Sequence, residues 1–296
     1  MILYYIFRFA ELILMRFSHQ SRRNFFLFLA HIAYKIDSKH RLVILQNLHF
    51  ALGKEMSKNE QESISRYCYE NLLLSMLQVM ENRYLSKDDI ASLVEIKNRH
   101  ITDEALKSGR PIIFVSAHYA NWELGAAAVS SLITPTTAIY KKFTNPYFDR
   151  YLIESRSRQN MLMVEKRGAV RHLTKAIKNG RAIMLMVDQN TNKRDGIAVK
   201  FFNKSARQSA APAFLARKYN GIIIPVLMDT QDSQNYTVVV CDAIEVEHSD
   251  NAEADILKAT QKQSDVVEKM IREKPKLWFW CHRRWKTEHP EIYKES

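Results

Sequence analysis

Residues 111–125 read PIIFVSAHYANWELG, and this stretch decides the fold class. The β-branched and aromatic run from Pro111 to Ser116 predicts a buried strand, and the polar turn and small residues after it predict a helix. His118 lies in the turn, at the carboxyl end of the predicted strand. Open α/β sheets bind their ligands at this position, so the sequence places His118 where chemistry is expected.

Glu123 follows His118 by five positions. Five residues along one continuous helix point about 140° apart, so the two side chains would not meet if both were helical. If Asn121 caps the helix, His118 precedes it and Glu123 lies in its first turn, where the side chains can converge. The helix N-terminus also favours the ionised carboxylate. This geometry predicts that Glu123 orients His118 and that His118 takes a proton from a hydroxyl.

The spacing by itself is a weak signal, since His248 and Glu253 repeat it in an acidic stretch with no strand before it. A buried histidine that is hydrogen-bonded to a neighbour is the alternative interpretation of His118. The motif alone does not separate the two.

Composition limits the classes of function. The chain has 296 residues, 46% of them hydrophobic, so it can bury a large core with an accessory helical layer. Lys and Arg outnumber Asp and Glu by 44 to 32, and the net charge of +12 predicts an anionic partner: nucleic acid, lipid, a phosphorylated substrate or an acidic protein. Cys68, Cys241 and Cys281 form no C-x-x-C pair, which argues against a disulfide framework or zinc site and fits a reducing cytosolic face.

The apolar run over residues 1–7 resembles the start of a membrane span, but Arg8, Glu11 and Arg16 interrupt it. The next apolar stretch, residues 25–34, is shorter than the ~20 residues that a spanning helix needs. A signal peptide is not expected, because no basic region precedes the run and no small-residue cleavage site follows. We expect two amphipathic helices, ringed by Arg and Lys, in an anionic membrane interface; a core-packed pair and a single tilted span are the alternatives.

Ser57 and Glu60 form a capping-box signature that predicts a helix through about Tyr84. Strands and helices alternate from about residue 105, which predicts an α/β layer covered by the N-terminal helices. We therefore expect a helical membrane-associated region over residues 1–100 and an α/β domain over 101–296. Its expected strands cover 111–116, 137–140, 161–164, 182–187, 222–228 and 236–240, and its expected helices cover 121–132, 146–159, 169–179, 210–219 and 252–273.

Basic residues gather in the loops of the α/β part, at Lys141, Lys142, Arg156, Arg158, Lys166 and Arg167. Arginines at strand ends suit bidentate phosphate recognition, although a solvated surface is the commoner position for any one of them. The segment WFWCHRRWK, residues 278–286, interleaves aromatic and basic residues, as single-stranded nucleic-acid sites also do. No nucleic-acid-binding fold signature accompanies it.

Four ordered blocks resemble one family. They are HYANWELG (118–125), NPYFDRYLIESRSRQNM (145–161), MVDQN (186–190) with Phe201-Phe202, and WFWCHRRWKT (278–287). From about Arg41 to Thr287 the chain resembles the late acyltransferases of lipid A biosynthesis, the HtrB type, within the lysophospholipid acyltransferase superfamily. The main departure is the weak N-terminal span.

The resemblance implies transfer of a fatty acyl chain from acyl carrier protein to a hydroxyl of a 3-hydroxyacyl chain on a Kdo-bearing lipid A precursor. The implied fold is a central, mostly parallel or mixed sheet flanked by helices, as in glycerolipid acyltransferases, so residues 101–296 would be the acyltransferase domain. His118 would be the general base, oriented by Glu123. Arg156 and Arg158 would bind acceptor phosphates or sugar acids, and the further candidates at this site are Asn145, Asp188, Arg283 and Arg284.

The resemblance implies no metal and no bound cofactor. The implied partners are the acyl carrier protein donor, an anionic glycolipid acceptor and an anionic membrane, without nucleic acid, at the cytoplasmic face of the inner membrane. Two alternatives stay open. The acceptor could be another glycolipid or a glycerophospholipid, or the chain could be a non-catalytic basic protein that binds membrane or nucleic acid.

Overall fold

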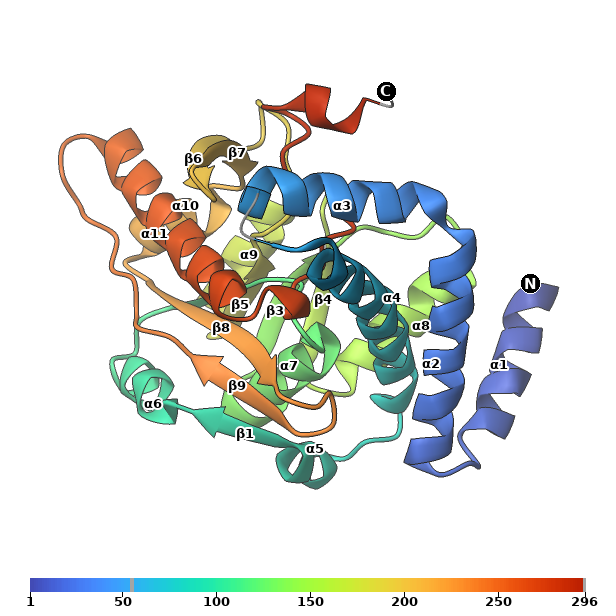
Figure 1. The fold of residues 1–296 in the computed structure, drawn as a ribbon. Helices are drawn as coiled ribbons and strands as arrows, with labels where there is room; N and C mark the ends of the chain where they lie inside the picture. Colours follow the sequence, from blue (N-terminus) through green and yellow to red (C-terminus); the bar gives the residue numbers. More distant parts are fainter. Residues whose placement is uncertain (54–55, 295–296) are drawn as a thin grey trace.

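The computed structural model describes residues 1–53 and 56–294, and its centre is a seven-stranded mixed sheet flanked by helices (Figure 1). The strand order is β1-β9-β8-β2-β5-β3-β4, and every neighbouring pair is parallel except β8 and β9. A separate antiparallel hairpin holds β6 and β7. The strands are β1 (Val94–Lys97), β2 (Ile112–Ser116), β3 (Thr136–Tyr140), β4 (Met161–Glu165), β5 (Ala182–Met186), β6 (Ile197–Phe201), β7 (Lys204–Gln208), β8 (Ile222–Thr230) and β9 (Tyr236–Val240). The predicted α/β class is confirmed.

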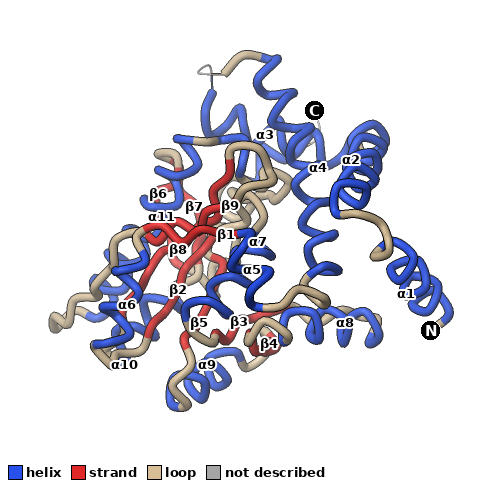
Figure 2. Tube along the Cα trace, turned by 90° about the horizontal axis from the view of Figure 1, so that it is seen from below, coloured by secondary structure: helices blue, strands red, loops and turns tan. Residues whose placement is uncertain are grey.

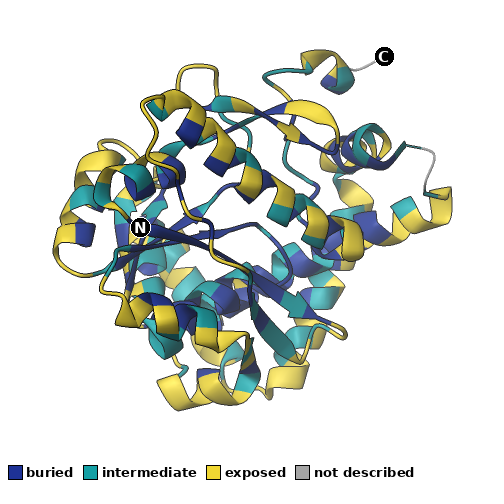
Figure 3. Cartoon of the chain, turned by 90° about the vertical axis from the view of Figure 1, so that its left-hand side faces the viewer, coloured by how far each residue is buried: buried dark blue, intermediate teal, exposed yellow. Residues whose placement is uncertain are grey.

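The helices surround this sheet, whose central strands β2, β5 and β8 are almost wholly buried (Figure 3). A π-helical turn, Val129–Ile133, extends α7, and two short 3-10 helices, Pro275–Leu277 and Pro290–Tyr293, lie near the C-terminus. The α-helices are α1 (Ile2–Leu14), α2 (His19–Ile36), α3 (Ser38–Leu52), α4 (Lys58–Glu81), α5 (Lys87–Leu93), α6 (Arg99–Lys107), α7 (Trp122–Ala128), α8 (Pro146–Ser157), α9 (Ala169–Lys178), α10 (Ala211–Tyr219) and α11 (Ala252–Glu273).

Each strand and helix that the sequence predicts is present, with small differences at the ends. The capping box is confirmed, since Ser57 and Glu60 exchange hydrogen bonds at the start of α4. Strand β1 and the β6–β7 hairpin were not predicted. Because β1 is only four residues long, its alternation is too short to identify. Strand β1 pairs with β9. One strand of the sheet therefore comes from residues 94–97, on the N-terminal side of the domain boundary expected at residue 100.

The helices α3 and α4 share one continuous core with the sheet and with the C-terminal segment. Asn47 of α3 is fully buried, and its amide donates hydrogen bonds to the carbonyls of Trp280 and His282, both at 2.7 Å. Such buried contacts across more than 230 positions tie the N-terminal helical layer to the end of the chain.

The C-terminal aromatic segment belongs to the core. Trp278, Trp280 and Trp285 are 1%, 0% and 0% exposed, and the rings of Trp278 and Trp280 meet edge to face at 4.6 Å. Buried indole rings cannot stack on nucleic-acid bases. The aromatic residues of this segment therefore do not support a nucleic-acid site.

At one end of the molecule lie α1 and α2 (Figures 1 and 2). Helix α2 packs along α4, and α1 contacts α8 through its aromatic rings. Of the helices in residues 1–53 and 56–294, none combines the length and apolar character needed to cross a membrane. Many large apolar side chains of α1 and α2 are nevertheless exposed.

Candidate active site

His118 and Asp188 meet at the carboxyl edge of the sheet because their strands, β2 and β5, are parallel neighbours. The backbone N–H of His118 donates to Asp188 Oδ2 at 2.9 Å, and His118 Nδ1 lies 2.9 Å from Asp188 Oδ1. A carboxylate only accepts, so Nδ1 carries the hydrogen in this contact. The other ring nitrogen, Nε2, is then left to accept a proton.

Asp188 is held in place by a third residue. Its side chain is 4% exposed, and Trp278 Nε1 donates to Oδ2 at 2.9 Å. Burial raises the pKa of Asp188, but the charge and hydrogen bonds of His118, with the bond from Trp278, move it well below its usual range. Asp188 is therefore ionised and fixed, as the orienting member of a histidine pair must be.

The imidazole of His118 is partly open to solvent, with 20% of the side chain exposed. Burial lowers the pKa of His118, but the charge and hydrogen bond of Asp188, together with the charge of Glu123, outweigh burial and raise this pKa above the ordinary value for histidine. The Trp122 ring lies edge to face at 5.2 Å, and the Gln189 amide nitrogen lies 3.5 Å from Nε2. Nε2 is thus the side of the ring that faces the approach to the site.

Glu123 makes a different contact from the one expected. Asn121 caps α7 as predicted, accepting from the N–H of Leu124 at 3.1 Å, and Glu123 lies in the first turn. Its two carboxylate oxygens, however, accept from Arg156 Nη2 at 2.6 Å and Nε at 3.1 Å. Asp188 already occupies Nδ1 of His118, and the planar guanidinium of Arg156 matches a carboxylate in two places. The expectation that Glu123 orients His118 is therefore corrected: Asp188 makes that contact.

The turn that carries His118 is fixed from two sides. Ala120 adopts a left-handed backbone conformation with φ +46°, which is unfavourable for a residue with a Cβ. Asn71 of α4 donates to the Ala120 carbonyl at 2.7 Å, and the Ala120 N–H donates to the Leu277 carbonyl at 2.8 Å. The Phe279 N–H donates to the His118 carbonyl at 2.9 Å. Helix α4 and the C-terminal segment together hold the histidine in position.

The remaining predicted residues do not all reach this site. Asn145 caps α8 by accepting from Tyr147 N–H at 3.0 Å, and the exposed Arg158 donates to the Arg83 carbonyl at 3.0 Å. Arg283 lies over the Tyr293 ring, 5.6 Å from its centre. Arg284 is fully buried, where it donates to the Arg207 carbonyl and lies over the Phe201 ring. The structure thus gives Asn145 and Arg284 local structural contacts, whereas Arg156 and Asp188 lie at the site.

Sequence reasoning missed Trp278, which fixes Asp188, and Trp122, which lines a narrow apolar cleft beside His118. The cleft runs between α7 and the sheet. Its volume is about 10 Å³, room for roughly one water molecule, so a longer ligand enters only where its walls move apart. Trp122 could have been found from its position at the start of α7, directly after the turn that carries His118. The contact of Trp278 with Asp188 depends on the tertiary fold, so the sequence could not reveal it. The residues that line the cleft include Ser116, Trp122, Gly125, Met184, Met186 and Met228.

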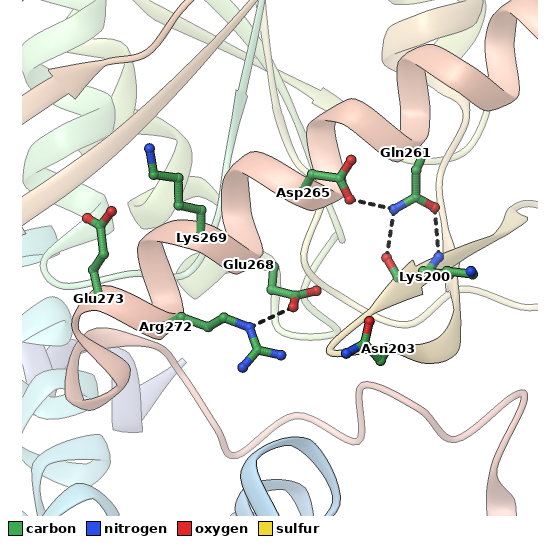
Figure 4. Close-up of a pocket in the computed structure, with 8 residues that line it drawn as sticks. All are labelled: Lys200, Asn203, Gln261, Asp265, Glu268, Lys269, Arg272 and Glu273. Carbon is green, nitrogen blue, oxygen red and sulfur yellow. Dashed lines mark hydrogen bonds and ion pairs between the residues drawn. The ribbon is translucent and has the colours of Figure 1, made fainter. Parts of the chain in front are cut away.

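A second, open pocket lies between the β6–β7 hairpin and α11 (Figure 4). Two pairs of its side chains bond each other: Arg272 donates to Glu268 at 2.7 Å, and Gln261 donates to Asp265 at 2.7 Å. None of the predicted site residues lines it. The chemistry therefore gathers at His118.

Known proteins match this chain over most of its length. A family model described as bacterial lipid A biosynthesis acyltransferase matches residues 1–287. A lipid A biosynthesis acyltransferase of Haemophilus influenzae is 24% identical over 260 residues, which covers 87% of this chain and 81% of that protein. A lipid A biosynthesis lauroyltransferase of Escherichia coli is 24% identical over 263 residues, covering 88% and 83%. A phosphatidylinositol mannoside acyltransferase of Mycolicibacterium smegmatis is 25% identical over 126 residues, covering 41% of each.

Proposed function

Because this chain belongs to the family of bacterial lipid A biosynthesis acyltransferases, we propose that it transfers a fatty acyl chain from acyl carrier protein to a hydroxyl of a Kdo-bearing lipid A precursor. Family membership makes it an acyltransferase of lipid A biosynthesis. The donor, the Kdo-bearing acceptor, the site residues and the place of reaction are the proposed parts. We place the reaction at the cytoplasmic face of the inner membrane.

His118 is the general base in this proposal. The acceptor hydroxyl binds at Nε2, its oxygen attacks the thioester carbonyl carbon, and Nε2 takes the hydroxyl proton. Collapse of the intermediate breaks the carbon–sulfur bond, and the imidazolium returns the proton to the leaving thiolate of the carrier protein. Asp188 keeps the hydrogen on Nδ1 and stabilises the imidazolium that forms. The single observation that supports this assignment best is the 2.9 Å contact of Nδ1 with Asp188, which leaves Nε2 as the acceptor.

Glu123 and Arg156 form the second part of the proposed site. Both Glu123 oxygens bind Arg156, so the guanidinium is fixed in orientation beside the base. Glu123 takes Nε and one hydrogen of Nη2, so a phosphate or sugar-acid group would bind the other end of the guanidinium, through Nη1 and the second hydrogen of Nη2. We propose that Arg156 binds an anionic group of the acceptor and that Glu123 positions Arg156. Exposed Arg158 and half-buried Arg283 are secondary candidates for the same acceptor.

The acyl chain of the donor is proposed to lie in the narrow cleft beside Trp122. Its walls are apolar, with Met184, Met186 and Met228 facing α7. Methionine fills irregular space and adapts to a flexible chain. The structure shows a space of only about 10 Å³ there, so the proposal requires these side chains to move apart as the hydrocarbon enters. With the thioester at His118, the opened cleft would select the length of the chain.

The direct test is a reconstituted reaction with acyl carrier protein thioesters and a detergent-dispersed Kdo-bearing lipid A precursor, followed by mass spectrometry of the product. We expect one added acyl chain, which depends on His118. A parallel test compares lipid A from a strain that lacks this protein with lipid A from its parent. Lipid A of unchanged mass, together with no transfer in the purified reaction, would reject the proposal.

A second candidate acceptor is another glycolipid. The match to a mycobacterial phosphatidylinositol mannoside acyltransferase favours it, because the name of that relative gives a glycolipid other than lipid A as its acceptor. The proposed base would activate either hydroxyl. Supplying both acceptors in the same assay separates the two, since the preferred acceptor should gain the chain at the higher kcat/KM.

A further inference from the structure

Helix α1 has two faces of opposite character. Its outer face, which is exposed, carries no charged side chain and consists of Ile2, Leu3, Tyr5, Ile6, Phe9, Ala10, Leu12 and Ile13. Ile2 is 74% exposed and Phe9 is 65% exposed. The two charged residues of the helix, Arg8 and Glu11, both lie on the face that contacts the rest of the protein. An apolar helix face of this size requires a covering partner.

The inner face of α1 is fixed to α8 by a buried carboxylate. Glu11 is 2% exposed and accepts from the Tyr151 hydroxyl at 2.7 Å. It also pairs with Arg8 at 3.1 Å and lies 3.9 Å from Arg83. We call Glu11, Arg8, Arg83 and Tyr151 the Glu11 cluster. A buried carboxylate with a hydroxyl and two guanidinium groups around it is a specific attachment, because loss of the contact would leave charge unpaired.

Aromatic rings extend this attachment along α8. Tyr4 stacks on Tyr147 with ring centres 5.4 Å apart, and Phe7 meets Phe148 and Tyr151 at 5.3 and 5.1 Å. Figure 2 shows α1 lying beside α8 at the end of the molecule. The same helix α8 carries Arg156 in its last turn. One rigid element thus joins the inner face of α1 to the arginine of the proposed site.

Exposed cations follow α1 and end α2, and they indicate what covers the apolar faces of these helices. Arg16 comes two residues after α1 and Lys35 lies in the last turn of α2; both are exposed, and neither has an ion pair among the described residues. Phe25, Phe28 and Ile32 of α2 are also exposed. Aromatic and aliphatic side chains bordered by free cations are typical of helices that lie in an anionic bilayer surface.

We infer that α1 is an in-plane membrane helix whose outer face enters an anionic lipid bilayer, while the Glu11 cluster fixes it to α8 and so sets the height of Arg156 above the lipid. The inference rests on the proposed function and adds the mode of attachment and its coupling to the site. With thirteen residues, α1 extends roughly 20 Å along the surface. Membrane binding then depends on the outer face of α1, and placement of the acceptor depends on its inner face, so the two can be tested separately.

The first experiment tests the outer face. Vesicles of phosphatidylethanolamine and phosphatidylglycerol are sedimented with the full-length protein. The double variant Ile6→Asp/Phe9→Asp is compared with Leu257→Asp, which changes an exposed leucine on α11. We expect the double variant to bind about tenfold more weakly or worse, and the control to bind as the parent does. Unchanged binding of the double variant would overturn the inference. So would a parent dimer that the double variant dissociates, since the face would then be an interface between copies.

The second experiment tests the Glu11 cluster. Glu11→Leu keeps the outer face but removes the attachment, and Glu62→Leu replaces an exposed glutamate as the matched control. Glu11→Leu should bind vesicles as tightly as the parent and show faster hydrogen exchange in α1. The rate of acyl transfer to acceptor held in vesicles, divided by the rate with detergent-dispersed acceptor, should fall about fivefold or more. If Glu11→Leu does not fold, Glu11→Gln keeps the shape and tests the same ratio. An unchanged ratio and unchanged exchange in α1 would overturn the inference. A parent protein without transfer even in detergent would reject the proposed function instead, and the binding and exchange measurements would still test the helix.

Discussion

Two buried carboxylates, Asp188 at the sheet edge and Glu11 in α1, have similar surroundings and different consequences. They are 4% and 2% exposed, and each accepts from an aromatic donor, Trp278 at 2.9 Å or Tyr151 at 2.7 Å. The cationic partners differ. Asp188 binds His118, which can gain or lose a proton, whereas Glu11 binds Arg8 and Arg83, which stay charged at every relevant pH.

The difference shows that burial and hydrogen bonding alone do not make a carboxylate part of a reaction. Asp188 affects chemistry because its partner has a second nitrogen that faces the approach to the site. Glu11 has no such partner, so its interactions can only fix one helix to another. Substitution should therefore change turnover in the first region, and attachment or stability in the second.

The largest expected effect is on turnover at the sheet edge. His118→Ala should lower kcat roughly 10³–10⁴-fold, because the base acts in the transition state. Asp188→Asn should lower kcat nearly as far, since an amide can hold the other tautomer and cannot stabilise the imidazolium. Steady-state kinetics on detergent-dispersed acceptor measures both, with circular dichroism to verify folding. Transfer by His118→Ala at close to the parent rate would contradict the assignment of the base.

Glu123 provides a sharper comparison, because it is the carboxylate that the sequence pairs with His118. Glu123→Gln should cost about 10–100-fold, mainly as a higher KM for a phosphorylated acceptor, since it loosens Arg156. Arg156→Lys should act in the same direction and leave the KM for the acyl donor nearly unchanged. If Glu123→Gln instead lowered kcat as far as Asp188→Asn does, with both KM values unchanged, Glu123 would be the orienting residue after all.

The contrast between Glu123 and Asp188 also marks the limit of prediction from sequence. The strand, the turn, the Asn121 cap and the position of His118 follow from residues within about one helical turn, so local patterns were enough. Asp188 is 70 positions from His118, and its partnership depends on β5 lying next to β2. The position of Asp188 after a predicted strand identified it as a site candidate. That position did not reveal that its partner is His118. Trp278, 90 positions further on, and buried Arg284 could not be placed without the core.

The pH dependence of kcat/KM tests the Asp188 contact directly. The neutral form of His118 is the base, so activity should fall as the pH falls through the pKa of His118. Asp188 raises that pKa above the ordinary value for histidine, so the acidic limb of the parent protein should lie at a higher pH than for an unperturbed imidazole. In Asp188→Asn burial remains and lowers the pKa, so the limb of the residual activity should move to lower pH. An acidic limb that stays in place would contradict the contact.

The apolar cleft gives a smaller effect that belongs to the same region. Met186→Phe should narrow the cleft and shift donor preference toward chains about two carbons shorter, by roughly tenfold in relative kcat/KM, since each buried methylene contributes ~0.8 kcal/mol. Leu162→Phe, at an exposed position on β4, is the matched control and should leave the preference unchanged. Competition between carrier protein thioesters of different length measures the ratio. An identical product distribution in both variants would place the acyl chain elsewhere.

The smallest effect on turnover is expected at the Glu11 cluster. Tyr151→Phe removes one hydrogen bond to a buried carboxylate, which should lower the free energy of unfolding by about 1–3 kcal/mol, because Glu11 loses a donor without regaining water. The kcat on detergent-dispersed acceptor should stay within about twofold, since the hydroxyl touches no residue of the proposed site. Tyr147→Phe is the control: its ring stacks on Tyr4, and its hydroxyl has no recorded hydrogen bond among the described residues, so its stability should change by less than about 0.5 kcal/mol. Urea unfolding and hydrogen exchange of α1 provide the measurements. A large loss of kcat in Tyr151→Phe with normal stability would show that the two buried carboxylates are not separate in function, and that the α1–α8 interface takes part in the chemistry itself.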